Sequence, residues 1–202
     1  AASDVYKRQI WAASDLDYVE TYLDEIKEMK GYTKLLCAQV ITRQMGIVDD
    51  AVYYPFVQME RRPPWFNADI MLGVHFWGTI TCKLINFAVY MGFKNIYLLG
   101  VDNNWPVRKN EDGKYMYDVN VKSHFDDSYF AGGYSEKLEK NINDMIKSIE
   151  YMDASYKSVK WNCEQLGVKI FNSTRGGKLE EFPRIKIEDA INKICLLYTS
   201  PS

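Results

Sequence analysis

The sequence predicts an α/β domain built on a mainly parallel sheet, and three observations support this fold class. Segments in which apolar residues recur at helical spacing alternate with short apolar runs typical of buried strands. Short glycine-containing links join several helices to the strand that follows, as in βαβ units. The 202 residues are 47% hydrophobic and 26% charged, a composition typical of a globular protein and not of a disordered chain.

The first predicted elements are a helix and two strands. Ser14 can cap a helix whose apolar residues keep helical spacing as far as Gly31, a good terminating residue. The apolar run 35–41 has no helical period and predicts a buried strand. The run 52–59 predicts another strand, which Pro55 should begin or place at a sheet edge.

The middle of the chain predicts a helix, a buried strand and a long loop. The helix is expected from Gly78 or Thr79 to Met91, and strand 96–102 follows a tight link. This strand is apolar along nearly its whole length, so we expect it to be buried on both faces. The polar segment 103–133 is too long for a simple connector and predicts a lid or binding wall.

The last third predicts a long helix, a strand and a final helix. Apolar residues alternate in steps of four and three from Leu138 to Leu166, and Gly167 ends the pattern. One or two helices lying on the sheet explain this stripe, and a dimerising coiled coil is the alternative. A strand is expected at 168–171 and a helix at 187–194.

Composition narrows the classes of partner and location. The formal net charge of -2 gives no electrostatic reason to expect a nucleic-acid partner. The four cysteines form no CxxC pair, which favours buried free thiols in a reducing, cytoplasmic compartment over a zinc site. No apolar run approaches the ~20 residues that a transmembrane helix needs.

The two ends of the sequence do not continue the patterns beside them. Residues 1–9 and 195–202 resemble translated sequencing-adapter sequence, so we expect both to be artefactual extensions. Ordinary loose termini are the alternative. On the first interpretation the domain covers residues 10–194 and lacks its first strand or strands.

Two predicted strands end in polar sequence, at the position where ligands bind in open α/β sheets. Asp102, Asn103 and Asn104 end the first strand. Asp102 could bind a ribose hydroxyl, a metal or a substrate hydroxyl, or it could cap the following turn. Arg175 follows strand 168–171 and precedes two glycines, where it could hold a phosphate or carboxylate.

The start of the helix after Gly78 is a third candidate. Gly78, Thr79 and Thr81 place a flexible residue and two hydroxyl groups at a helix amino terminus. Free backbone N–H groups and the helix dipole favour an anion such as phosphate there. Plain capping by Thr79 explains the same residues equally well.

The long loop adds titratable groups. His124 lies beside carboxylates and could act as a general acid or base, or be a surface histidine without a role. His75 could line the same cleft or be a packing residue. A magnesium site formed by Asp102 with Asp118, Asp126 and Asp127 of the neighbouring loop is conceivable, although their spacing does not demand one.

Several segments, taken in order, resemble the hydroxymethylpterin diphosphokinase-like (MptE-like) domain family. They are 78–81, 90–102, 123–125, 171–179 and 182–184. The middle portion is also similar to bacterial sialyltransferases that use CMP-sialic acid. The resemblance implies a Rossmann-like three-layer fold with a nucleotide over the strand ends. Many proteins of the family lie among bacterial genes for surface polysaccharides.

The resemblance also implies residue roles. It places Thr79 and its neighbours against the nucleotide, and residues 102–104 on the cleft floor. His124 falls near the sialyltransferase base, but alignment places that base at Ser128. The Asn-Gly-Pro-Ser-type loop of the family's first strand does not occur here.

Three functions follow as hypotheses. The leading one is a glycosyltransferase-like enzyme of surface polysaccharide synthesis that moves a sugar from a CMP-sugar or similar nucleotide donor to a glycan. In it, His124 is the candidate base, and Thr79, Thr81 and Arg175 hold the phosphate. The second is a magnesium-dependent hydroxymethylpterin diphosphokinase that uses ATP. The third is a non-catalytic module that forms a homodimer through the 135–167 helix.

Overall fold

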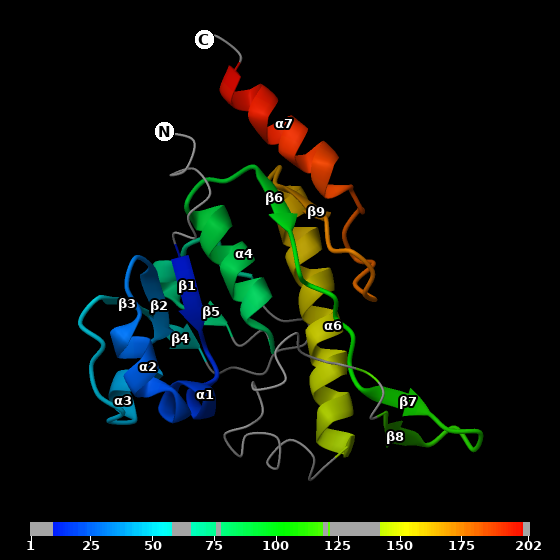
Figure 1. The fold of residues 1–202 in the computed structure, drawn as a ribbon, viewed down its shortest axis with the longest axis horizontal. Helices are drawn as coiled ribbons and strands as arrows, with labels where there is room; N and C mark the ends of the chain where they lie inside the picture. The colour runs from blue at the N-terminus through cyan, green and yellow to red at the C-terminus, as the bar shows by residue number, and fades with distance from the viewer. Residues whose placement is uncertain (1–9, 58–65, 76–77, 119–120, 122–141, 200–202) are drawn as a thin grey trace.

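The chain folds as a mixed α/β structure with small, mostly parallel sheets (Figure 1). The computed structural model describes residues 10–57, 66–75, 78–118, 121 and 142–199. Within these ranges the strands form four separate sheets where the sequence predicted a single one. No helix in the described part of the chain is both long enough and apolar enough to cross a membrane.

The first sheet is parallel, with the order β1–β2–β3. Its strands are β1 (Ile10–Ala13), β2 (Thr33–Cys37) and β3 (Ala51–Tyr54). The connecting helices are α1 (Leu16–Thr21), α2 (Leu23–Glu28) and α3 (Gln39–Thr42). Figure 1 shows the three helices gathered at one side of this sheet.

Three details of this region differ from the prediction. Asp15, and not Ser14, caps the first helix: its Oδ1 accepts from the N–H groups of Asp17 and Tyr18 at 3.0 and 3.2 Å. The single expected helix is divided at Tyr22. The strand predicted for 35–41 stops at Cys37, and the chain then turns into α3.

Pro55 divides the strand predicted for 52–59. β3 ends before it, and β4 (Phe56–Val57) begins after it and pairs in parallel with β5 (Val74–His75). A proline has no N–H to continue a ladder. Its carbonyl instead accepts from the N–H of Val74 at 2.8 Å. Residues 58–59 lie outside the described ranges.

The second half of the fold rests on two neighbouring helices and a pair of parallel strands. The helices are α4 (Ile80–Tyr90) and α6 (Ile142–Gln165), and the strands are β6 (Asn95–Leu98) and β9 (Lys169–Asn172). A short 3-10 helix, η1 (Ile70–Leu72), precedes β5. The predicted helix–link–strand units are confirmed for α4–β6 and α6–β9, and the two strands pair directly.

The expectation that strand 96–102 is buried on both faces is wrong. Leu98 is buried, Tyr97 is half-buried, and Leu99 is 65% exposed just after β6 ends. Tyr97 stacks on its cross-strand partner Phe171, with ring centroids 5.3 Å apart. The strand therefore has one buried face and one partly open face.

The long helix lies against its own domain. Met152, Tyr156, Val159 and Cys163 of the predicted stripe are buried, and α6 packs against α4 and β9. After α6, Gly167 adopts a φ of +68°, and the N–H of Val168 closes the end on the carbonyl of Cys163 at 2.8 Å. The prediction of a helix lying on strands is thus confirmed within 142–165.

The segment predicted as loop 103–133 contains a β-hairpin. Strands β7 (Val107–Lys109) and β8 (Tyr115–Tyr117) pair antiparallel and project from the body in Figure 1. The side chain of Asn110 closes the turn by accepting from the N–H of Lys114 at 2.8 Å.

The last helix, α7 (Ile187–Thr199), contains the predicted 187–194 helix. It continues through residues expected to be an artefactual extension. In Figure 1 it extends beyond the rest of the chain.

Candidate functional site

The structure brings the ends of two strands together. β6 and β9 are parallel neighbours, so their carboxyl ends lie at one edge. The N–H of Val101 donates to Oγ1 of Thr174 at 3.0 Å across 73 residues of sequence. The N–H of Lys178 donates to the carbonyl of Asp102 at 2.6 Å. The two polar segments that the sequence singled out at strand ends therefore form one surface.

Asp102 and the two asparagines after it form a tight turn. Oδ1 of Asp102 accepts from the N–H of Asn104 at 3.3 Å. Asn103 has a φ of +50°, and its side-chain amide donates to Oδ1 of Asp153 on α6 at 3.1 Å. The Trp105 indole N–H donates back to Oδ1 of Asn103 at 2.9 Å. Asn103 therefore ties the turn to α6, whereas the Asp102 carboxylate makes one weak bond to the described residues.

Gly177 makes the closest approach between the two segments. A Cβ placed on it would lie 2.5 Å from the carbonyl oxygen of Asp102 and 2.6 Å from its Cα. Its φ of +78° also favours glycine. A side chain at this position would push the 173–180 loop away from the end of β6.

Asn172 is a buried residue whose side chain supports the base of this loop. The residue is 1% exposed, and its amide donates to the carbonyl of Leu179 at 2.9 Å. Its Oδ1 accepts from the N–H of Thr174 at 2.9 Å. The side chain thus spans the loop and satisfies backbone groups at both ends, as a buried amide must.

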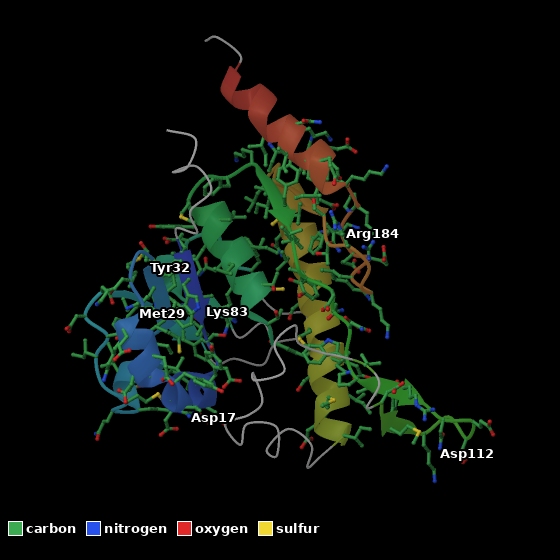
Figure 2. The ribbon with its side chains drawn as sticks, viewed as in Figure 1. Asp17, Met29, Tyr32, Lys83, Asp112 and Arg184 are labelled. Atoms are coloured by element: carbon green, nitrogen blue, oxygen red, sulfur yellow. The ribbon has the colours of Figure 1, made fainter. Side chains whose placement is uncertain are left out.

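Arg184 holds the outer side of the same loop (Figure 2). One of its Nη atoms donates to the carbonyls of Thr174 and Gly176 at 3.1 and 2.8 Å. The other donates to the carbonyl of Gly177 at 3.3 Å. Nε donates to both carboxylate oxygens of Glu180 at 2.9 and 3.0 Å, and this bonding lowers the pKa of that carboxyl. A planar guanidinium suits such a set of acceptors, which a lysine could not match.

Sequence reasoning gave Arg184 no role of its own. The one available signal was its spacing of four residues from Glu180, beside a proline. Nothing in that spacing indicates that the guanidinium would bond to three carbonyls of one loop.

A pocket of about 320 Å³ opens between this loop and the start of α7. Its wall is formed by residues 172–175 and 184–188. Nη2 of Arg175 lies 3.8 Å from Oε1 of Glu188, and the two side chains are 88% and 68% exposed. This exposed contact is loose, so both groups stay accessible in the pocket.

The start of α4 is arranged differently. Oγ1 of Thr79 accepts from the N–H of Thr81 at 3.2 Å, which is the plain capping geometry. Gly78 has a φ of +67°, and a Cβ there would lie 3.0 Å from Cγ of Met152. Burial raises the pKa of Tyr156 to about 12, and hydrogen bonds from Thr79 and Thr81 lower it in part. Side chains of α6 therefore lie beside the predicted anion position, and residues 78–81 are half-buried.

The remaining sequence candidates are placed only in part. His124, Asp126, Asp127 and Ser128 lie outside the described residues. His75 is buried at the end of β5.

Of the aspartates considered for magnesium, Asp102 and Asp118 are described, and Oδ2 of Asp118 lies 3.5 Å from Nε of Arg108. The described ranges contain no group of three or more histidine, cysteine, aspartate or glutamate side chains that could hold a metal ion. Asp126 and Asp127 lie outside the described residues, and Asp102 and Asp118 by themselves do not make a magnesium donor set.

Lys83 is a buried charge that sequence reasoning missed. It lies on α4 and is 1% exposed, with Nζ 5.2 Å from the centroid of the Phe56 ring (Figure 2). Burial lowers the pKa of Lys83 to about 8, and nearby Cys37 and Asp15 oppose that shift. The helix α4 packs against β1, β5 and α6, so Lys83 is buried together with apolar residues of the same helix.

No family model, curated protein or solved structure matches this chain. The family resemblance therefore remains a prediction.

Proposed function

We propose that the protein is a transferase that binds a nucleotide-activated substrate over the carboxyl ends of β6 and β9. The observation that carries the proposal is the direct junction of two polar strand ends, Asp102 to Lys178 and Val101 to Thr174. In parallel α/β structures, this is the edge where ligands bind. We further propose that the small sheets belong to a Rossmann-like three-layer arrangement.

The chemistry of the exposed groups fits the two parts of a nucleotide. The Asp102 carboxylate, with its single bond to Asn104, can accept hydrogen bonds from ribose or substrate hydroxyls. Arg175 is exposed on the same surface and can pair with phosphate oxygens. As charge develops on the leaving phosphate, a fixed cation stabilises the transition state more than the ground state.

The type of transfer comes from the resemblance and not from the geometry. It favours a sugar transferred from a CMP-sugar or a related donor to a glycan, with His124 as the candidate base. A magnesium-dependent diphosphokinase is the alternative, but no observation of the described residues favours it.

The module hypothesis depends on a stripe that is buried only in part within the described residues. The part of the 135–167 stripe from Met152 to Cys163 is buried within the chain. A homodimer through this part of the stripe would require α6 to leave α4 and β9.

The test is a calorimetric titration of the whole chain with CMP, UDP and ATP, followed by assays of nucleotide release from CMP- and UDP-sugars. Asp102→Asn should weaken nucleotide binding by about tenfold, since hydrogen bonds to a charged group contribute about 1.5–3 kcal/mol. Asp112→Asn, at the tip of the β7–β8 hairpin, removes the same charge far from the site and should change nothing (Figure 2).

Absence of binding by all three nucleotides would contradict the proposal, as would equal effects of the two substitutions. Binding of ATP alone, and only with magnesium, would replace the leading hypothesis with the diphosphokinase.

A further inference from the structure

The pocket beside α7 is lined by more cationic side chains than the carboxylate of Glu188 can neutralise. Arg175, Arg184 and Lys186 line it, against Glu188. Arg184 is neutralised by Glu180 and by loop carbonyls. Within the described ranges Lys186 has no ion pair, and Arg175 has only the contact of 3.8 Å with Glu188. One cation is therefore left over at an accessible surface.

The start of α7 adds to the positive electrostatic potential of the pocket. α7 begins at Ile187, inside the pocket wall, and runs to Thr199. The first N–H groups of a helix have no partner within it, and the helix dipole makes this end positive. The pocket thus combines the exposed cations of Arg175 and Lys186 with backbone donors of a helix start, an arrangement that favours a multivalent oxyanion.

Ser173 supplies an independent observation. It forms part of the pocket wall and is 4% exposed, yet its Oγ has no hydrogen-bond partner in the described part of the chain. Buried hydroxyl groups are rarely left in this state without a reason. Ser173 thus places in the pocket wall a hydroxyl donor that the described residues leave without an acceptor.

We propose that this pocket binds a phosphate group, held by Arg175, Lys186 and the first turn of α7, and that Glu188 competes with it for Arg175. Phosphate suits the site because it has several acceptor oxygens and about two negative charges near neutral pH. The inference rests on the proposed function for the source of the phosphate, which is the nucleotide. The ability of the pocket to bind phosphate is separate and can be measured by itself.

Inorganic phosphate is the first probe, titrated into the whole chain against chloride at equal ionic strength. Arg175→Gln should raise the Kd for phosphate by about tenfold or more, because it removes a charge-assisted bond. Lys169→Gln is the matched control. Lys169 is exposed at the amino end of β9, and its replacement removes the same charge about 10 Å along the strand, beyond the Debye length of about 8 Å in physiological salt.

The second pair of variants tests the role of Glu188. Glu188→Gln should lower the Kd for phosphate about threefold, a change within the range of exposed ion pairs. Asp189→Asn removes the same charge from the next residue of the first turn, which does not line the pocket, and should have a smaller effect. All four positions are exposed, so folding should be retained, as far-UV circular dichroism will show.

The proposal is overturned if phosphate binds no better than chloride, or if Arg175→Gln and Lys169→Gln behave alike. It is also overturned if Asp189→Asn strengthens phosphate binding as much as Glu188→Gln, because general charge would then explain both. Phosphate binding without any nucleotide binding would support the pocket and reject the proposed function, so the two can fail separately.

Discussion

The starts of α4 and α7 have the same local chemistry but differ in accessibility: residues 78–81 are half-buried, whereas Lys186, Glu188 and Asp189 are exposed. Each helix presents free N–H groups and a positive dipole end near the carboxyl ends of parallel strands. At α4, Thr79 caps the helix, and Tyr156 and Met152 of α6 lie over it. At α7, the first turn faces a pocket with Arg175 and Lys186 in its wall.

This difference teaches that a helix amino terminus becomes a binding site only where packing leaves it open and supplies charge. The threonines of α4 gave the stronger sequence signal, and the structure uses them for a cap and for hydrogen bonding to a tyrosine. The start of α7 follows an unremarkable Arg-Ile-Lys segment in the sequence. The pocket at this helix start exists because the 173–180 loop folds beside it.

The largest expected effect is a difference between two adjacent glycines, Gly176 and Gly177, in the 173–180 loop beside the start of α7. Gly177→Ala should destabilise the fold by about 3 kcal/mol or more, because its Cβ would lie 2.5 Å from backbone of Asp102. Gly176→Ala should cost about 1–2 kcal/mol, since Gly176 has a similar φ of +70° but no atom within 4 Å of a Cβ. Urea unfolding of both variants measures the difference, and equal losses would show that the contact with Asp102 is unimportant.

The next effect concerns Lys83, which is buried on α4. Lys83→Met should raise the free energy of unfolding at pH 7 by about 2–3 kcal/mol, because the pKa of about 8 reflects a charge that burial disfavours. Below pH 8, Lys83 is protonated in both the folded and the unfolded state, and the full penalty is present. Between pH 8 and 10.5 the folded state loses its proton first, so the penalty fades.

The gain from Lys83→Met should therefore shrink as the pH rises from 8 toward 10.5. Burial raises the pKa values of Tyr156 and Cys163 in the folded state. These two groups therefore make the folded state less stable as the pH rises above their pKa values in the unfolded state. Both proteins share that loss, so the difference between them isolates Lys83. A gain that stays constant from pH 7 to 10 would mean that Lys83 is not desolvated.

The smallest effect sharpens the comparison between the two helix starts. Thr79→Ala should reduce stability by about 1 kcal/mol, the usual cost of a lost cap. The same loss is expected with and without phosphate, because the Thr79 cap and the α6 side chains beside it already occupy this helix end. Thermal unfolding in phosphate and in chloride checks this, and a phosphate-dependent loss would indicate that the start of α4 also binds the anion.

Several features of the fold could be predicted because they depend on neighbouring residues. The period of α4 and α6, the stop at Gly167 and the break at Pro55 all follow from local chemistry. The boundary errors near Ser14 and at 38–41 arose where two short elements meet, and local preferences there differ little.

The sequence by itself determined the α/β class, the main helices and the two polar segments that follow β6 and β9. Only the tertiary structure decided that these segments touch, that Arg184 fixes their loop and that Lys83 is buried. The physical reason is that these outcomes depend on contacts between residues far apart in the chain, such as Val101 with Thr174. Access to a helix end is likewise set by whatever packs over it, and no residue of the helix specifies that.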